Sequence, residues 1–300
     1  MTPDLGPPML HAATSANWSW NLSHDVRDMF SYPFMVNAFR AGTIVAIVAA
    51  VVGWFMVLRK QTFAGHTLSV AAFPGAAAAT LVGISATVGY FGFCLVAALV
   101  IAVASRPARS KGFSAESAVV GTVQAFVLAS GYLFASLYKG LLNGLNNQLF
   151  GFTFGISDAQ VATLAIVGLL VLGAVTVIGR PLFFASIDAD VAAARGVGVR
   201  AIGVVFLLLL GAAAAEASQI TGALLVFALL VMPAAIAQRL TARPLGGIAL
   251  ALAIGVVVTW AGLTAAYYTS YPSGFCITTF AFAGFVVARA VSVPATGAHP

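Results

Sequence analysis

Long apolar stretches alternate with short polar connections along most of the chain. Runs such as Ala41 to Leu58 and Ile202 to Ala215 are apolar at nearly every position, so they lack the two-residue alternation of a half-buried strand. A helix of about 20 such residues crosses a hydrocarbon layer of about 30 Å. The pattern predicts an all-α polytopic transmembrane helical bundle of about eight or nine spans. The nine candidate spans cover residues 37–58, 66–85, 88–105, 116–138, 158–179, 201–217, 220–238, 245–266 and 275–290.

Polar residues at the two ends divide the chain into three parts. Residues 1–30 have no apolar core of signal-peptide length and are expected to form a flexible polar tail, residues 31–291 the transmembrane domain, and residues 292–300 a C-terminal tail. Met29 could itself serve as a start, so it stays open whether residues 1–28 are translated. Only Ser218 and Gln219 separate the sixth and seventh candidate spans, which suggests a tight re-entrant hairpin.

The composition places the protein in a membrane. Charged residues make up 7% of the chain and hydrophobic residues 61%, which excludes an ordinary soluble domain. The 14 basic residues are scattered singly, so they do not form the clustered patch that nucleic acid needs. Basic residues prefer cytosolic loops, and an N-terminus outside puts all of them inside except Arg27, Arg40 and Lys139. With nine spans, the protein would cross the cell membrane with its N-terminus outside and its C-terminus in the cytoplasm.

Several kinds of chemistry are absent from the sequence. No lysine is followed by serine or threonine in a glycine-rich context, so the chain cannot hydrolyse ATP through a P-loop. No Ser-His-Asp arrangement or histidine-rich metal cage can be assembled from the spans, and we predict neither enzyme activity nor a resident cofactor. The acidic residues Glu116, Asp158 and Glu216 are placed near span ends, which weakens an ion-coupled secondary carrier. Energy for transport would then come from another chain.

Two polar entries into the spans could line a transport route. In the second span, His66 could bind a metal or merely cap or anchor the helix, while Pro74 and Gly75 predict a bend with close helix approach. In the seventh, Gln219 and Gly222 form a polar turn that leads to Pro233. That turn and bend could be a gate, or a kink that fits neighbouring helices.

The loop from Ile187 to Gly203 gathers charges among small residues. Asp188 is expected to cap a short helix whose N-terminal end favours acidic residues, and glycines would end it. The helix could dock into a cleft of a soluble ATPase, or it could simply cover the end of the bundle. The residues expected to matter are Asp188, Asp190, Ala193, Arg195, Gly196 and Gly198.

Several segments together resemble the metal-type ABC-3 permease family, the membrane subunits of zinc and manganese ABC importers. The matching stretches are residues 51–77, 117–131, 149–151, 188–203 and 218–241, of which SQITGALLVFALLVMPAAIAQRLT at 218–241 is the most specific. The resemblance implies a type II ABC importer-like permease that pairs with a second copy, an ATP-binding cassette ATPase subunit that carries ATP, and an extracytoplasmic metal-binding protein. Asp188 to Gly198 would then be the ATPase-coupling helix. The protein itself would lie in a bacterial plasma membrane.

One motif departs from that family. Its second span usually contains Gly-Asp-Ala-Leu-Ser-His, with the Asp and the His on one helix face, whereas this chain has His66 and Val70 at those positions. The favoured function is a permease for a divalent transition metal, with zinc first and manganese or iron next, passing with few direct contacts. A permease for a metal chelate of the cobalamin or siderophore type, an ion-coupled secondary transporter and a scaffold for an ATPase are the alternatives.

Overall fold

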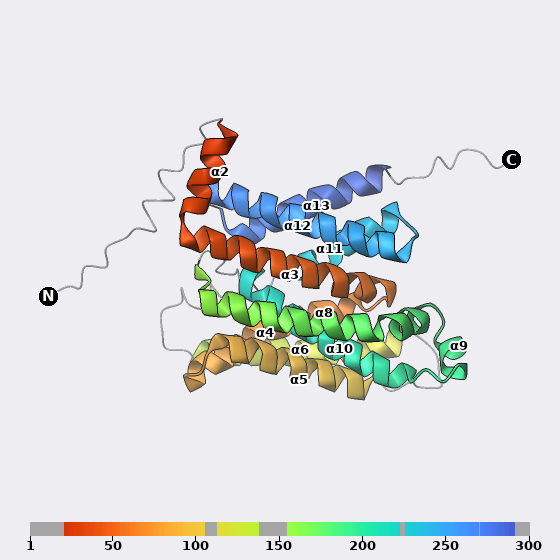
Figure 1. Cartoon of the computed structure of the whole chain (residues 1–300). Helices are drawn as coiled ribbons and strands as arrows, with labels where there is room; N and C mark the ends of the chain where they lie inside the picture. Colours follow the sequence, from red (N-terminus) through yellow and green to blue (C-terminus); the bar gives the residue numbers. More distant parts are fainter. Residues whose placement is uncertain (1–20, 106–112, 138–154, 223–225, 270, 292–300) are drawn as a thin grey trace.

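The computed structural model describes residues 21–105, 113–137, 155–222, 226–269 and 271–291. Regular secondary structure in these ranges is helical (Figure 1). The helices are α2 (Leu22–Ser31), α3 (Pro33–Leu58), α4 (Thr62–Val82), α5 (Ala86–Ala104), α6 (Phe113–Leu137), α8 (Asp158–Ile187), α9 (Ala189–Ala194), α10 (Val199–Thr221), α11 (Val226–Leu240), α12 (Pro244–Tyr268) and α13 (Ser273–Val291).

Nine of these helices correspond to the nine candidate spans. Among the described residues, eight helices are long and apolar enough to cross a membrane, and α11, at 15 residues, is shorter. A helix of 15 residues is about 22 Å long, less than the hydrocarbon thickness of about 30 Å. The all-helical transmembrane bundle predicted from the sequence is confirmed, and α11 is the element that makes the count eight or nine.

The helix ends follow from local chemistry. Pro33 and Pro244 stand in the first turn of α3 and α12, where a missing amide hydrogen costs nothing. At the start of α8 the Ser157 hydroxyl accepts a hydrogen bond from the Gln160 amide, and the Gln160 side chain accepts one from the Ser157 amide. α8 also continues through Pro181 to Ile187, past its predicted end at residue 179.

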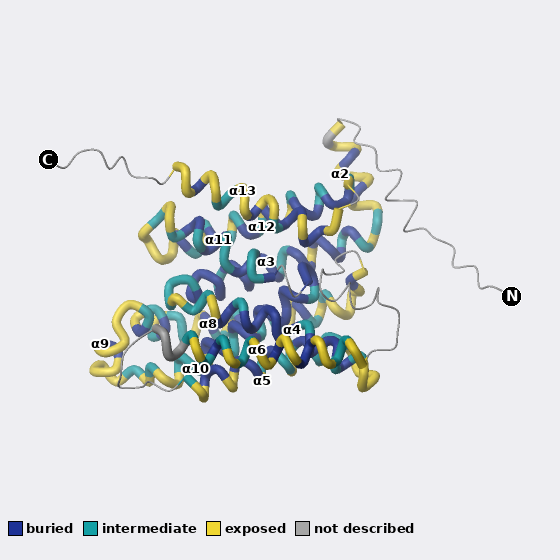
Figure 2. The backbone as a smooth tube through the Cα atoms, turned by 180° about the vertical axis from the view of Figure 1, so that it is seen from behind, coloured by how far each residue is buried: buried dark blue, intermediate teal, exposed yellow. Residues whose placement is uncertain are grey.

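The helices form a bundle around α10. This helix contacts α3, α4, α5 and α8, while α4 also packs against α5 and α6, and α3 against α11 and α12. Buried residues concentrate in α3 and α4, whereas α9 is mostly exposed (Figure 2). Large apolar side chains point outward from the peripheral helices, for example Tyr132 on α6 and Leu169 and Val177 on α8, as expected for a surface that faces lipid.

The two short helices α2 and α9 lie at opposite ends of the bundle (Figure 1). α3 begins at the α2 end and α13 finishes at the α9 end, consistent with an odd number of passes. We refer to the end that carries α9 as the coupling end, after the role that the sequence analysis expects for this helix.

Part of the expected N-terminal tail is helical. In α2, Asp25 and Met29 are buried, and the Tyr267 hydroxyl of α12 donates a hydrogen bond to Asp28 Oδ2 at 3.2 Å. The Tyr268 hydroxyl donates another to the Asp25 carbonyl at 3.3 Å. The segment 22–31 therefore packs on the end of α12. The rest of the expected tails, at 1–20 and 292–300, lies outside the described residues.

Candidate functional site

The loop between α8 and α10 forms the short capped helix that the sequence predicted. Asp188 is the N-cap of α9, and its Oδ1 accepts hydrogen bonds from the amides of Asp190 at 3.1 Å and Val191 at 2.9 Å. These two bonds satisfy amide groups that a helix start leaves without partners. The carboxylate also stands where the positive end of the helix dipole stabilises a negative charge.

Glycines end α9 and begin α10. The Gly196 amide donates to the Ala193 carbonyl at 2.9 Å, and Gly196 adopts φ +83°, a left-handed conformation that glycine takes without strain. Gly198 is the N-cap of α10. The predicted local structure of this loop is confirmed, and its role in docking an ATPase stays a prediction.

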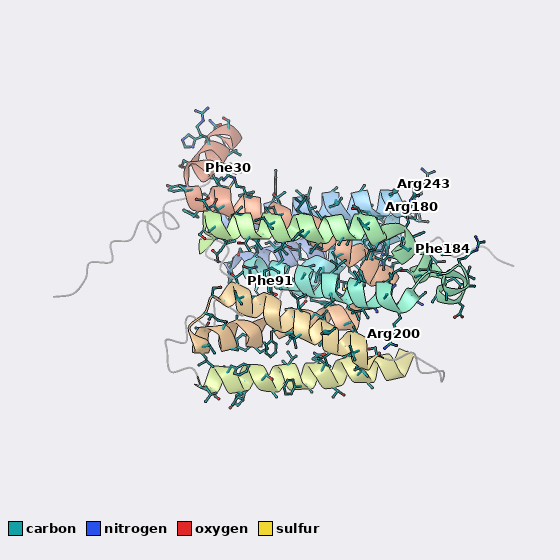
Figure 3. All side chains as sticks on the ribbon, turned by 60° about the horizontal axis from the view of Figure 1, so that its bottom comes forward. Phe30, Phe91, Arg180, Phe184, Arg200 and Arg243 are labelled. Carbon is teal, nitrogen blue, oxygen red and sulfur yellow. The ribbon has the colours of Figure 1, made fainter. Side chains whose placement is uncertain are left out.

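One side of α9 packs on the bundle and the other faces away from it. Ala192 is fully buried, whereas Asp190, Ala193 and Arg195 are exposed. Arg180, Arg200 and Arg243 lie toward this same end of the molecule (Figure 3). The coupling end thus presents a short rigid helix with both acidic and basic side chains around it.

Arg59, which the sequence analysis did not single out, joins three helices at the coupling end. Its guanidinium donates hydrogen bonds to Ser186 Oγ at 3.3 Å and to Gln61 Oε1 at 3.1 Å, and it lies 5.4 Å from the centre of the Phe206 ring. Ser186 stands at the end of α8, two residues before the cap of α9. Arg59 therefore ties the end of α3 to the base of α9 and to α10.

In α4, Gly75 permits the close helix contact that the sequence predicted. A Cβ on Gly75 would overlap the carbonyl oxygen of Gly89 in α5, and a Cβ on Gly89 would overlap that of Gly75. Pro74 stands inside α4, where it removes one amide donor, and the helix continues through it to Val82.

His66 is the fifth residue of α4, so it does not cap the helix, which is the role of Gln61. Its ring packs edge-on against the Phe227 ring with centroids 5.1 Å apart, and its Nδ1 is buried without a hydrogen-bond partner in the described part of the chain. Val70, one turn further on, is buried and offers no ligand atom. Among the described residues no three His, Cys, Asp or Glu side chains form a group that could enclose a metal ion.

The predicted hairpin turn at Ser218 and Gln219 is wrong. Both residues belong to α10, which continues to Thr221. The helix ends at Gly222, whose φ is +77°. The Ser218 and Thr221 hydroxyls donate to the carbonyls of Ala214 and Ala217 one turn back, so these polar side chains are satisfied within the helix. The polar residues here suggested a turn, but their hydrogen bonds to carbonyls one turn back allow the helix to continue.

The residues predicted to line a transport route lie in two separate parts of the bundle. The first turns of α5 bring two of them together, because Thr87 donates to Gln219 Oε1 at 3.2 Å while Gly89 lies against Gly75. Pro233 is buried in α11 on the side of α12, where a Cβ on Gly255 would lie 3.8 Å from its ring. Gly75 and Gln219 therefore share a neighbourhood that Pro233 does not.

Glu216 was placed near a span end from the sequence, but its carboxylate lies inside the bundle. The residue is fully buried in α10, and its Oε1 lies 3.1 Å from the position that a Cβ on Gly168 of α8 would occupy. The Ile44 and Val48 side chains, on either side of the middle of α3, approach the same position at 3.2 and 3.0 Å. The sequence does not reveal this burial, because the carboxylate extends from the side of α10 toward α3 and α8, whose contacting residues are distant in the chain.

The apolar bundle with a short capped helix at one end is consistent with one class of protein, the membrane-embedded permease of an ABC transporter. The family model of the ABC 3 transport family matches residues 31–292, and the chain belongs to this family. The resemblance seen in the sequence is thereby confirmed.

Named relatives cover most of the chain. It is 30% identical over 268 residues to the manganese transport system membrane protein MntC of Halalkalibacterium halodurans, which covers 89% of this chain and 90% of the relative. It is 29% identical over 250 residues to the chelated iron transport system membrane protein YfeC of Yersinia pestis, covering 83% of each. A solved structure, PsaBC from Streptococcus pneumoniae in complex with Fab, superposes with a TM-score of 0.78 and 25% identity over 89% of this chain and 95% of that chain. The chain is thus a membrane permease of the metal-transporting ABC type.

Proposed function

We propose that the chain is the permease subunit of a bacterial importer for divalent manganese, energised by a separate ATPase subunit and supplied by an external metal-binding protein. The observation that carries this proposal is the match to the ABC 3 transport family over residues 31–292. The capped helix α9 supports the proposal, because a short rigid helix at one end of the bundle could dock into a cleft of an ATPase subunit. Family membership also favours a permease over an ion-coupled carrier or a scaffold.

The order of metals differs from the sequence-based expectation. The sequence analysis placed zinc before manganese, whereas the relatives described above are named for manganese and chelated iron. Manganese therefore comes first in the proposal, and zinc and iron are competitors to be measured. A chelate is the second candidate, favoured by the relative named for chelated iron.

Sidedness and assembly complete the proposal. The basic residues Arg180, Arg200 and Arg243 lie toward the coupling end, which supports placing that end in the cytoplasm of a plasma-membrane protein. The opposite end, with α2, would face the external binding protein. Two copies of the permease would pair, with one ATPase at each coupling end.

Transport in reconstituted vesicles tests the function. The permease, its ATPase and the external binding protein are purified together, and ATP-dependent uptake of labelled manganese is measured with zinc, iron or an iron chelate as competitor. Uptake of manganese that requires ATP, with stronger competition by free metal than by chelate, supports the proposal. The proposal is contradicted if no ATPase copurifies, or if an ion gradient drives uptake without ATP.

A further inference from the structure

Among the acidic residues whose burial the structure describes, Glu216 lies deepest in the spans. The chain has eight acidic residues, of which Asp4 lies outside the described part. Six others stand at helix starts or in the two short end segments: Asp25, Asp28, Glu116, Asp158, Asp188 and Asp190. In α10, by contrast, Glu216 is fully buried, and neither of its carboxylate oxygens has a hydrogen-bond partner within the described residues.

The packing beside the carboxylate places it inside the bundle, well away from the ends of α3 and α8. Gly168 is the eleventh residue of α8, so it lies about 15 Å along that helix from its start. Ile44 and Val48 are on either side of the midpoint of the 26-residue α3. The two other side chains that approach the Cβ position of Gly168 are aliphatic and offer the carboxylate no hydrogen-bond donor.

An unpaired carboxylate in this position is costly. Removing a carboxylate from water carries an effective penalty of several kcal/mol even after relaxation. In the part of the chain that the structure describes, no hydrogen-bond donor offsets this penalty. Ionisable residues inside membrane spans commonly mark the routes of ions. A bound cation would offset this cost.

A second oxygen donor stands one turn away. Gln219 is three residues further along α10 and on the same side of the helix. Its amide nitrogen has no partner among the described residues, while its oxygen accepts from Thr87. Because the amide oxygen and nitrogen are assigned by the hydrogen-bond network, their exchange would keep a bond to Thr87 and free the oxygen. Carboxylate and amide oxygens suit a hard divalent cation such as manganese.

We propose that Glu216, together with Gln219, forms a binding site on α10 for the divalent cation in transit. The inference rests on the proposed import function and identifies where in the permease the substrate makes contact. Two protein ligands with water make a weak site, which suits an ion that must also be released. The site differs from His66 on α4, where Val70 leaves the imidazole without a second ligand one turn on.

The binding test uses the purified complex of permease and ATPase. Manganese binding is measured by the loss of the free-ion electron paramagnetic resonance signal in wild type, Glu216→Gln and Asp158→Asn. Glu216→Gln should weaken binding at least tenfold, because a neutral amide replaces the charge with nearly the same shape. Asp158→Asn, which changes an acid at the start of α8, should bind within twofold of wild type. Equal binding by Glu216→Gln and wild type overturns the site.

A second variant keeps the carboxylate but crowds it. Gly168→Ala adds a methyl group 3.1 Å from Glu216 Oε1 and 3.0 Å from Val48, so it should weaken manganese binding without removing a charge. Gly173→Ala is the matched control, because a Cβ there meets nothing within 4 Å. If the crowding acts through the carboxylate, Gly168→Ala combined with Glu216→Gln should bind no worse than Glu216→Gln alone. An additive loss overturns this assignment, as does a melting temperature of Glu216→Gln far below that of wild type.

Uptake in vesicles separates this inference from the proposed function. If wild type imports no metal with ATP, the proposed function fails. If wild type imports manganese and Glu216→Gln does so with the same KM, only the site on α10 fails. Reduced uptake with unchanged manganese binding also overturns the cation site and assigns the carboxylate to a proton.

Discussion

Gly75 and Gly89 face each other where α4 crosses α5, and each would place a Cβ against the carbonyl oxygen of the other. Gly75→Ala or Gly89→Ala should therefore force the two helices apart. Overpacking of this kind costs about 1–3 kcal/mol, and backbone atoms cannot move aside as a flexible side chain can. We expect a lower melting temperature of the detergent-solubilised protein for either variant.

Gly92→Ala is the control for this contact. It lies on α5, one turn after Gly89, and a Cβ there meets nothing within 4 Å. Its melting temperature should equal or exceed that of wild type, because alanine favours a helix by about 1 kcal/mol relative to glycine. An unchanged melting temperature of Gly89→Ala would show that the helices do not approach so closely.

Asp188→Ala should weaken the attachment of the ATPase. The change removes the acceptor of two amide hydrogen bonds at the start of α9, and loss of such a cap costs about 1 kcal/mol. A frayed α9 would dock less firmly, so less ATPase should copurify with the permease. Asp188→Asn keeps an acceptor oxygen and should restore most of the copurified ATPase.

Ser157→Ala provides the comparison for Asp188→Ala. Ser157 caps the start of the 30-residue α8 by the same kind of bond, at the opposite end of that helix from α9. This variant should lower the melting temperature by a similar amount while the ATPase still copurifies fully. Equal loss of ATPase in both variants would mean that general stability, and not α9, controls the attachment.

The sequence predicted the elements whose causes are local. Apolar residues on every face predicted the spans, and Asp188 with Gly196 predicted a short capped helix, because capping depends on residues a few positions apart. The turn at Ser218 failed because a hydroxyl that bonds a carbonyl one turn back is compatible with a helix. Arg59 and Glu216 could not be assigned, since Arg59 meets Ser186 across 127 positions and Glu216 lies against Gly168 of another helix.

Arg59→Ala should reduce the coupling of ATP hydrolysis to transport. The variant loses hydrogen bonds to Gln61 and Ser186 and the contact with the Phe206 ring, each worth about 0.5–1.5 kcal/mol. Movement of α9 would then reach α3 and α10 less directly. We expect fewer manganese ions imported per ATP hydrolysed, measured in the same vesicles. Arg59→Lys should recover little, because an ammonium cannot replace the planar fork of donors.

Lys60→Asn tests whether any basic residue at this junction has the same effect. Lys60 is exposed next to Arg59 and adopts φ +58°, which asparagine tolerates better than most residues. The ratio of manganese to ATP should stay at the wild-type value in this variant. A drop equal to that of Arg59→Ala would assign the effect to surface charge in place of the three-helix contact.

His66→Phe separates the chemistry of the imidazole from its packing. A phenyl ring can keep the edge-on contact with Phe227 but has no nitrogen to offer a metal, whereas His66→Ala loses both. If the buried Nδ1 contributes a ligand, both variants should raise the KM for manganese uptake severalfold, and only His66→Ala should also lower the melting temperature. If His66 only packs, His66→Phe should transport like wild type, and the route would then depend on oxygen ligands alone. Measuring KM and melting temperature on the same preparations distinguishes these outcomes, because loss of packing changes both quantities and loss of a ligand changes only the first.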